Sequence, residues 1–497
     1  MDRTRVFLHT RHQVGRVHRR LFGGFVEHLG RAIYGGLYDP DSAHADDSGW
    51  RTDVLAALRK LDFTVMRYPG GNFVSGYRWQ DGIGPRSERP ARLDEAWNSL
   101  EPNHVGTDEF LQLAETMGWE PMVAVNLGTG TPDEAAAWVA YCNGAPDSEW
   151  GRIRADNGRR EPYGVRLWCL GNEMDGPWQI GHVPAGVYAE RARQAMEQLR
   201  TVSPDIEVVA CGSSNTEMPT WLEWDQEVLQ GIGPGVDYIS LHRYAGKKTP
   251  DTLDFLAITN DIDRQIESVD ATCRFVAEKG RFRRRAFLCF DEWNVWYRTA
   301  FKKFSDGGGK FAQPLIEERY NLEDALVVAG FINSFLRHAD VVHVANLAQI
   351  ANAIAPVLTL DDRLLVQSIY WPLAMMASRR NGVSLVVGTE GPSYVSDSYG
   401  LASCLDVAAV HDADRVHLSI VNRSEKQAIA EISVDDRSVE KLLSMQLMTG
   451  DDPKAENTLE APDRVTATDY SGGKVDRGRA VLEMPPLSYL ACTIELG

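Results

Sequence analysis

Short apolar runs alternate with longer stretches of helical spacing along the first three quarters of the chain. The helical stretches include residues 51–61, 107–117, 132–142, 185–200 and 321–338. Eight apolar runs predict strands at 21–28, 63–68, 121–126, 165–173, 206–214, 236–244, 285–293 and 341–349. Strand and helix in alternation are typical of a parallel sheet, and eight repeats predict a (β/α)8 TIM barrel.

The pattern changes after residue 380. Short strand-like runs follow one another, separated by Asp, Gly, Ser and Pro, and no helical spacing interrupts them. This pattern of short strands and turns predicts a C-terminal antiparallel β-sandwich that is similar to a jelly roll. The opening residues also alternate, so we expect them to supply strands to the same sandwich. We therefore predict a catalytic barrel over 18–380 and a sandwich domain from 1–17 and 381–497.

Polar side chains collect where the predicted barrel strands end. One polar residue at a strand end is usually structural, because strands end at the surface. In a barrel, however, the carboxyl ends of all the strands meet at one mouth, where catalytic groups are found. The sequence therefore predicts a site there, with residues at these ends: Glu27, Arg67, Asn126, Asn172, Glu173, Ser213, Ser214, His242, Tyr244, Glu292 and Gln349.

Composition narrows the classes of function. The 497 residues carry a formal net charge of −18, which argues against a nucleic-acid partner. No apolar run is long enough for a signal peptide or a membrane span, so we expect a cytoplasmic protein. The seven cysteines lack C-x-x-C spacing, and neither H-E-x-x-H nor a phosphate-binding glycine motif occurs. We expect no metal and no cofactor.

Two carboxylates stand out among the strand ends. Glu173 follows the fourth predicted strand and Glu292 the seventh, so they face each other across the mouth. A carboxyl pair that flanks a bond is the machinery of glycoside hydrolysis, with one group as acid and the other as nucleophile or base. We expect Arg67, His242 and Tyr244 to keep Glu292 charged, and the two carboxyl groups to lie about 5–5.5 Å apart.

Several motifs resemble glycoside hydrolase family 51, whose members include α-L-arabinofuranosidases. The resemblance rests on "FGGFVEHLGRAIYGGLYDP" (22–40), "MRYPGGNFVSGYRWQDGIGP" (66–85), "WCLGNEMDGPWQIGH" (168–182), "SLHRY" (240–244) and "FDEWNVWY" (290–297). It implies that Glu173 is the acid/base and Glu292 the nucleophile of an exo-acting, retaining enzyme. It further implies homo-oligomers, often hexamers, that need no metal and act on arabinofuranosyl oligosaccharides.

The resemblance also implies roles for residues around the two carboxylates. Hydrogen bonds to the furanose hydroxyls are expected from Glu27, Asn72, Asn172 and Gln349. Arg67, His242 and Tyr244 match residues near the carboxylates, and Trp97 and Trp296 match aromatic positions of the pocket wall. By contrast, Trp168 lies inside an apolar strand and is expected to pack in the barrel, while His28 and His182 are expected to be structural.

Two alternatives remain open from the residues alone. The same machinery serves an endo-glucanase or a β-xylosidase, because fold and carboxylates do not name a sugar. An open aromatic cleft would favour these, whereas a closed pocket favours the exo-acting arabinofuranosidase. A non-catalytic carbohydrate-binding protein is the other alternative, although it is expected to lack one of the glutamates. Residues 298–320 form an insertion without a clear match, and we expect it, with the flexible-looking "SDGGGK" (305–310), to overhang the mouth.

Overall fold

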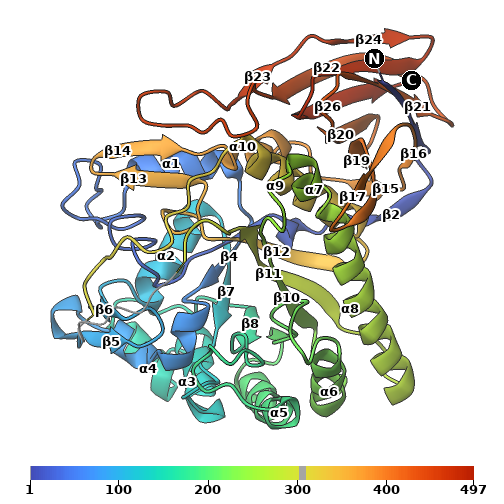
Figure 1. The fold of residues 1–497 in the computed structure, drawn as a ribbon. Coiled ribbons are helices and arrows are strands. Elements are labelled where there is room, and N and C mark those ends of the chain that lie inside the picture. The colour runs from blue at the N-terminus through green and yellow to red at the C-terminus, as the bar shows by residue number, and fades with distance from the viewer. Residues whose placement is uncertain (1, 301–308) are drawn as a thin grey trace.

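A closed barrel of eight parallel strands forms the larger part of the molecule (Figure 1). The computed structural model describes residues 2–300 and 309–497. Each of the eight predicted runs overlaps one barrel strand, so the prediction of the (β/α)8 barrel is confirmed. In order around the barrel the strands are β3 (Gly23–Phe25), β4 (Val65–Tyr68), β7 (Glu120–Ala124), β8 (Leu167–Leu170), β9 (Glu207–Ala210), β10 (Tyr238–Ala245), β11 (Phe287–Val295) and β12 (Val342–Ala348).

Helices surround the barrel and bury their apolar stripes against it. Several begin with a capping box, as at Thr131 and Glu134, where each side chain accepts from the backbone N–H of the other residue. The helices are α1 (Thr52–Leu61), α2 (Thr107–Met117), α3 (Pro132–Asn143), α4 (Glu149–Asp156), α5 (Ala185–Val202), α6 (Glu223–Ile232), α7 (Thr252–Leu256), α8 (Thr259–Gly280), α9 (Leu322–Arg337) and α10 (Tyr370–Met376).

Two β-sheets pack face to face beside the barrel, and together they are called the sandwich here. Their inner faces share one apolar core. One sheet has the order β16 (Gly388–Glu390), β1 (Asp2–Leu8), β21 (Ala428–Val434), β25 (Arg479–Met484) and β24 (Gly473–Asp476). The other has the order β2 (Gln13–Arg16), β15 (Val383–Leu385), β19 (Leu405–Asp412), β20 (Arg415–Asn422), β26 (Ser488–Leu496), β22 (Val439–Met448) and β23 (Ala467–Asp469).

The predicted C-terminal sandwich is therefore confirmed, and strands from the amino terminus lie in both of its sheets. Most neighbours are antiparallel, but β1 runs parallel to β21. Helix α9 lies between the two parts of the molecule and is buried from Leu322 to Leu336. A helix that is buried on every side needs cover on every side. The barrel covers one side of α9, and strands β19 and β20 cover another.

The structure also holds short elements that the apolar pattern did not predict. They are the hairpins β5 (Arg92–Asp94)–β6 (Ser99–Glu101), β13 (Val357–Leu360)–β14 (Arg363–Val366) and β17 (Ser393–Ser396)–β18 (Gly400–Ser403), with the 3-10 turns η1 (Arg19–Leu21), η2 (Asn72–Gly76), η3 (Trp79–Gly82) and η4 (Arg86–Glu88). Most of the flexible-looking "SDGGGK" lies outside the described residues.

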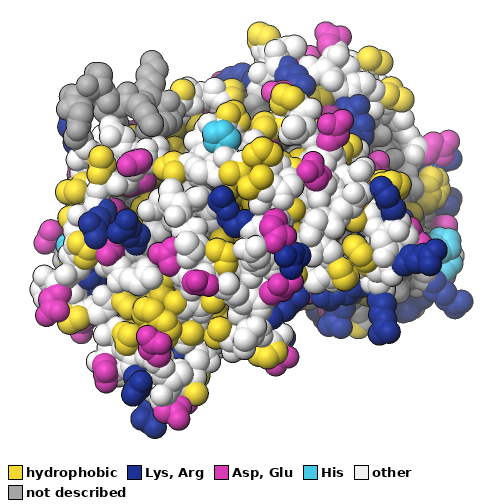
Figure 2. All heavy atoms as spheres, turned by 90° about the horizontal axis from the view of Figure 1, so that it is seen from below, with side chains coloured by type: hydrophobic (Ala, Val, Ile, Leu, Met, Phe, Trp, Pro, Cys, Tyr) yellow, Lys and Arg dark blue, Asp and Glu magenta, His cyan; other side chains and the backbone are white. Residues whose placement is uncertain are grey.

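The surface carries charges of both signs. Figure 2 shows acidic and basic side chains spread over the face seen from below, with basic ones gathered toward one edge. Among the described residues, no helix is both long enough and apolar enough to cross a membrane.

Candidate active site

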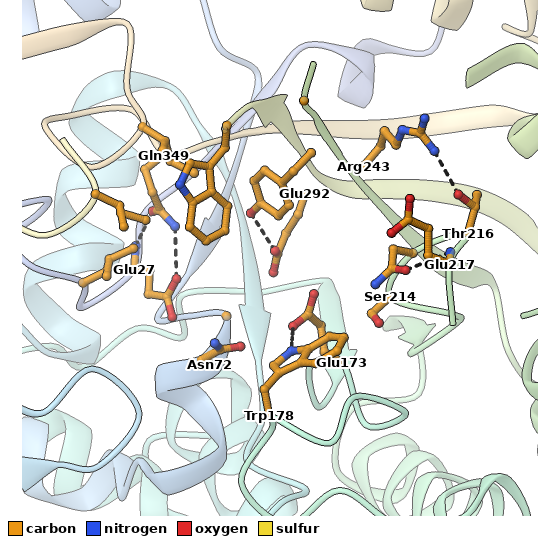
Figure 3. Close-up of a pocket in the computed structure, with 18 of the residues that line it drawn as sticks. Glu27, Asn72, Glu173, Trp178, Ser214, Thr216, Glu217, Arg243, Glu292 and Gln349 are labelled. Atoms are coloured by element: carbon orange, nitrogen blue, oxygen red, sulfur yellow. Dashed lines mark hydrogen bonds between the residues drawn. The ribbon is translucent and has the colours of Figure 1, made fainter. Parts of the chain in front are cut away.

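Glu173 and Glu292 meet in a cavity of about 610 Å³ at the carboxyl ends of the barrel strands (Figure 3). Glu173 follows β8, and Glu292 lies within β11. One carboxylate oxygen of each and a ring nitrogen of His242 all lie within 4.8 Å of one another. The two predicted partners are thus brought together. Other predicted residues in the cavity lining are Glu27, Asn72, Trp97, Ser214, Tyr244, Trp296 and Gln349.

Hydrogen-bond donors surround Glu292. Arg67 Nη1 donates to Oε1 at 2.7 Å, and the Tyr244 hydroxyl donates to Oε2 at 2.8 Å. His242 Nδ1 lies 3.4 Å from Oε2. Burial raises the pKa of the Glu292 carboxyl, against the opposing effects of His242 and Arg67, and the charge of Glu173 adds to the rise. The donors therefore offset only part of the cost of burying this charge.

Glu173 is held in an uncommon backbone conformation. Its φ is 41°, in the left-handed region that residues other than glycine rarely adopt. Gly171, with φ of 94°, begins this turn after β8. The Trp178 indole donates to Glu173 Oε2 at 2.5 Å, and His242 Nδ1 lies 2.9 Å from Oε1. Trp178 belongs to the quoted motif but was not singled out in the sequence, and it lines the cavity while remaining 47% exposed.

A buried polar layer supports both carboxylates from below. Arg67, Asn172 and His242 belong to this layer and are not among the residues that line the cavity. Arg67 Nη2 donates to Asn172 Oδ1 at 2.7 Å and lies 3.4 Å from Asp291 Oδ2. His242 Nε2 lies 3.0 Å from Asp291 Oδ1. Burial alone would lower the pKa of His242, but Glu292 and Asp291 raise it well above its ordinary value.

Sequence reasoning missed Asp291. Side chains alternate between the two faces of a regular strand, so a residue next to Glu292 is expected to point away from it. The pairing of β11 with β12 shifts register between Phe290 and Trp293. At this irregularity Asp291 and Glu292 both approach Arg67. The dipeptide Asp-Glu could be seen in the sequence, but the shift in register that turns both side chains toward Arg67 could not.

Buried side chains surround Glu27 at one end of the cavity. Its Oε1 accepts from the Phe73 N–H at 3.0 Å and from the Trp97 indole at 3.0 Å. Gln349 Nε2 donates to Oε2 at 3.1 Å. Burial raises the pKa of Glu27 to about 8, and the charge of Glu292 adds to the rise. Asn72 lies at the same end, as Figure 3 shows. We call this part of the cavity the closed end.

The close approach of a loop to Glu27 requires glycine at position 71. A Cβ atom there would lie 2.4 Å from Glu27 Oε2, too near for any real contact. The motif "RYPGGN" therefore serves the packing of Glu27, rather than acting as a turn alone.

The opposite part of the cavity is lined by Ser214, Glu217 and Arg243, which Figure 3 places away from Glu27. Trp296 also lines the cavity, and its ring meets that of Tyr244 edge-on, with centroids 5.4 Å apart.

Three residues expected to be structural have structural contacts. Trp168 is fully buried and packs against Trp138. His28 is buried between Glu101 and Tyr68, at 2.7 and 3.1 Å. His182 Nδ1 lies 3.0 Å from the carbonyl oxygen of Gln179.

In the part of the chain that the structure describes, the side chains of Glu173, His242 and Glu292 also lie close enough together to hold a metal ion. The Arg67 guanidinium, 2.7 Å from Glu292, would repel a cation there. Donors already occupy both carboxylates, and this arrangement suits proton transfer and nucleophilic attack.

Comparison with known proteins agrees with this geometry. Two family models match the chain, the α-L-arabinofuranosidase 1 domain over residues 57–264 and the α-L-arabinofuranosidase C-terminal domain over 291–488. The intracellular exo-α-(1→5)-L-arabinofuranosidase 1 of Bacillus subtilis is 40% identical, over 98% of each chain. An exo-α-(1→6)-L-arabinofuranosidase of Bifidobacterium longum is 37% identical, over 100% of this chain and 98% of the relative.

A solved structure points to the same family. A family 51 α-L-arabinofuranosidase from Bifidobacterium longum superimposes with a TM-score of 0.95 at 34% identity, over 99% of each chain. The matches cover the barrel and the sandwich together. The chain therefore belongs to the family 51 α-L-arabinofuranosidases, a family of glycoside hydrolases.

Proposed function

We propose that this enzyme is an exo-acting, retaining hydrolase that releases terminal non-reducing α-L-arabinofuranosyl residues from arabinan, arabinoxylan or their oligosaccharides. The observation that carries the proposal is the carboxylate pair in a cavity closed at one end. One oxygen of each carboxylate lies within 4.8 Å of the other, whereas inverting enzymes hold their carboxyl groups about 6.5–9.5 Å apart. The closed end favours a single terminal sugar over an internal stretch of chain.

In the first step Glu173 gives its proton to the leaving oxygen while Glu292 attacks the anomeric carbon. The glycosidic bond breaks and a covalent arabinosyl-enzyme forms. In the second step Glu173, now a carboxylate, takes a proton from water, and the water oxygen displaces Glu292. Two inversions at the anomeric carbon give retention. Arg67 and Tyr244 hold Glu292 in place for attack.

We propose that Glu27, Asn72 and Gln349 hydrogen-bond the arabinofuranosyl hydroxyls and that Trp97 closes the wall behind them. Their place in the closed end supports this. The amide oxygen of Asn172 accepts a hydrogen bond from Arg67. We therefore propose that Asn172, together with Arg67 and His242, holds the two catalytic carboxylates in position from below. Trp296 is assigned to the wall on the side of the leaving group.

The linkage and the setting are also proposals. The names of relatives favour an α-1,5 linkage, with α-1,6 as the alternative. Relatives are named intracellular, which supports a cytoplasmic enzyme that acts on small imported oligosaccharides. We further propose a homo-oligomer, a hexamer as the family resemblance implies, and a barrel over 18–380 with a sandwich from 1–17 and 381–497.

The decisive experiment is hydrolysis of 4-nitrophenyl α-L-arabinofuranoside by the wild type and by Glu292→Ala, with and without azide. We expect activity to be lost in the variant and restored by azide, with a glycosyl azide of inverted configuration as product. Azide replaces the missing nucleophile in a single displacement, which explains the inversion. A wild type that acts only on a β-xyloside or a glucan would contradict the sugar assignment but not the carboxylate pair.

A further inference from the structure

The insertion after β11 has a neck that one buried carboxylate holds together. The chain leaves the barrel through residues 297–299 and returns through 316–318. Both sides of this neck adjoin the cavity, because Trp296 and Ile316 are among its lining residues. Glu318 lies between the two sides and is completely buried. A fully buried glutamate needs partners for both of its oxygens.

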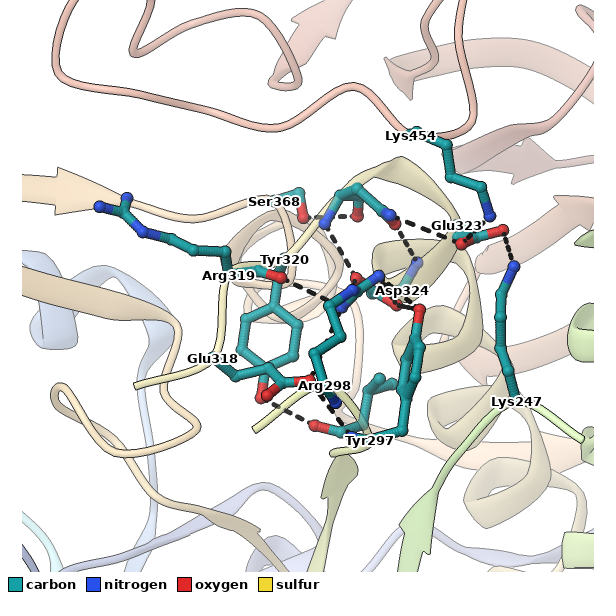
Figure 4. Close-up of polar contacts among 12 residues, drawn as sticks. Lys247, Tyr297, Arg298, Glu318, Arg319, Tyr320, Glu323, Asp324, Ser368 and Lys454 are labelled. Atoms are coloured by element: carbon teal, nitrogen blue, oxygen red, sulfur yellow. Dashed lines mark hydrogen bonds and ion pairs between the residues drawn. The ribbon is translucent and has the colours of Figure 1, made fainter. Parts of the chain in front are cut away.

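Glu318 finds these partners in three consecutive residues on the other side of the neck (Figure 4). Its Oε1 accepts from the backbone N–H groups of Tyr297 at 3.2 Å and Arg298 at 2.8 Å. Its Oε2 accepts from the N–H of Thr299 at 2.9 Å and from the Thr299 hydroxyl at 2.6 Å. Four donors converge on one side chain, and only a carboxylate can accept at both oxygens.

The clamped segment in turn fixes the cavity wall. The Trp296 indole donates to the carbonyl oxygen of Thr299 at 2.8 Å and lies 3.2 Å from its hydroxyl oxygen. The orientation of the Trp296 ring thus depends on a residue that Glu318 holds. On the return side, the Glu318 N–H donates to the carbonyl oxygen of Ile316 at 2.9 Å. Ile316 has φ of 44°, a strained value for a β-branched residue.

Other contacts hold Glu318 and the outer side of the neck. Gln367 Nε2 donates to the backbone carbonyl oxygen of Glu318 at 3.0 Å. Arg298 Nη1 donates to Asp324 Oδ2 at 2.9 Å, at the start of α9, as Figure 4 shows. Arg298 Nη1 also donates to the carbonyl oxygen of Arg319 at 3.1 Å, across the neck. The Glu318 carboxylate differs from this link because it binds the backbone N–H groups of residues 297–299.

We propose that Glu318 is a positioning residue that sets Trp296 and Ile316 as the wall against which the sugar beyond the scissile bond binds. The inference rests on the proposed arabinofuranosidase function. The hydrogen bonds of Glu318 go to residues 297–299, Ile316 and Gln367, and not to the catalytic carboxylates or the closed end. Its removal is therefore expected to weaken binding of the leaving-group sugar and to leave the chemistry on a small aryl substrate nearly unchanged.

The test compares Glu318→Gln with the wild type on α-1,5-L-arabinotriose and on 4-nitrophenyl α-L-arabinofuranoside, with kcat and KM measured separately. Either orientation of the new amide sets an NH2 group against a backbone N–H. We expect KM for arabinotriose to rise about tenfold, because the wall shifts by a fraction of an ångström. For the aryl substrate, kcat is expected to change by less than about twofold, because that substrate has no leaving-group sugar.

Glu317→Gln is the matched control. Glu317 is the preceding residue, and its side chain pairs with Arg31 and not with residues 297–299. It should leave both substrates unaffected. Glu318→Asp keeps the charge and should recover part of the affinity. If Glu318→Gln does not fold, as judged by circular dichroism, Thr299→Val replaces it, since it removes one of the four donors.

Equal losses on the two substrates, or unchanged KM for arabinotriose, would overturn the inference. Failure of the proposed function is visible separately, as a wild type without activity on either substrate.

Discussion

A single hydrogen atom in place of a side chain, at Gly71, allows Glu27 to occupy the closed end of the cavity. We expect Gly71→Ala to displace the Glu27 carboxyl and to lower kcat/KM about 10- to 100-fold, since small misplacements of binding groups are costly. Gly76→Ala is the control, because a Cβ atom there would meet only Ile180 Cδ1, at 3.8 Å. Steady-state kinetics on the aryl arabinofuranoside measures both. Equal effects from the two variants would contradict this account.

The charge of Glu292 sets the acidic limb of the pH profile. The nucleophile must be ionised, and burial raises its pKa above the ordinary value of 4.5. Activity, measured as kcat/KM, is therefore expected to fall as the pH drops through a midpoint above 4.5. Glu173 is protonated while Glu292 titrates, because it must still hold the proton that it gives to the leaving group, so the neutral Glu173→Gln should keep this midpoint.

An aryl leaving group is needed for this comparison, because it departs without much help from an acid. Glu217→Gln alters a carboxylate elsewhere in the lining and serves as the control, with an unshifted midpoint. A wild-type midpoint at or below 4.5, or a shifted midpoint in Glu173→Gln, would refute the assignment.

At the scale of strands, the two ends of the barrel have different tasks. The carboxyl ends carry the catalytic pair, whereas the opposite ends are closed by Arg20. Its guanidinium donates to Glu120 Oε2 at 3.0 Å, to Glu207 Oε2 at 2.7 Å and to the Tyr238 hydroxyl at 3.2 Å. The three partners come from strands β7, β9 and β10. One side chain thus links three strands at the end of the barrel opposite the active site.

Arg20→Leu is therefore expected to lower the free energy of unfolding by about 2–4 kcal/mol, since it leaves two carboxylates without their partner. Urea unfolding measures the loss, and kcat should be nearly unchanged. Arg19→Leu, at an exposed position, should have little effect.

Acid sensitivity adds a second readout. Burial alone would raise the pKa of Glu207, but Arg20 and Tyr238 lower it to about 2. Its contribution to stability is complete above pH 4.5 and is lost as the pH falls toward 2. This loss of stability between pH 4.5 and about 2 should disappear in Arg20→Leu.

The strands were predictable because each barrel strand is an apolar run with polar residues after it, and those ends placed Glu173 and Glu292 together. What depends on pairing between strands was not predictable. The register shift that brings Asp291 toward Arg67 has no signature in the order of residues. The hydrogen bond from the Trp178 indole to Glu173 was likewise not predictable, because Trp178 lies in a turn. Nor was the position of Arg67, Asn172 and His242 below the cavity.

At the scale of the whole molecule, α9 joins the barrel to the sandwich through buried polar contacts. Asn333 is completely buried, accepts from the Ser419 hydroxyl at 2.5 Å and donates to the Asp406 carbonyl oxygen at 3.1 Å. Asn333→Ala leaves these groups unsatisfied, at a cost of about 1–3 kcal/mol. Because barrel and sandwich share α9, we expect calorimetry to show one unfolding transition, shifted to lower temperature in the variant. Two separate peaks would show that the parts unfold independently.

The parallel pairing of β1 with β21 also has a consequence for synthesis on the ribosome. Asp2 pairs with Ala428 of β21, and the other neighbour of β1, β16, begins only at Gly388, so every barrel strand is translated before either partner of β1 exists. At about 5–20 residues per second, this segment waits on the order of 20–90 s without its neighbour. An unpaired strand is liable to associate with other chains, and outward-facing charges oppose this. Arg3 and Arg5, both on the exposed face of β1, supply such charges during that interval.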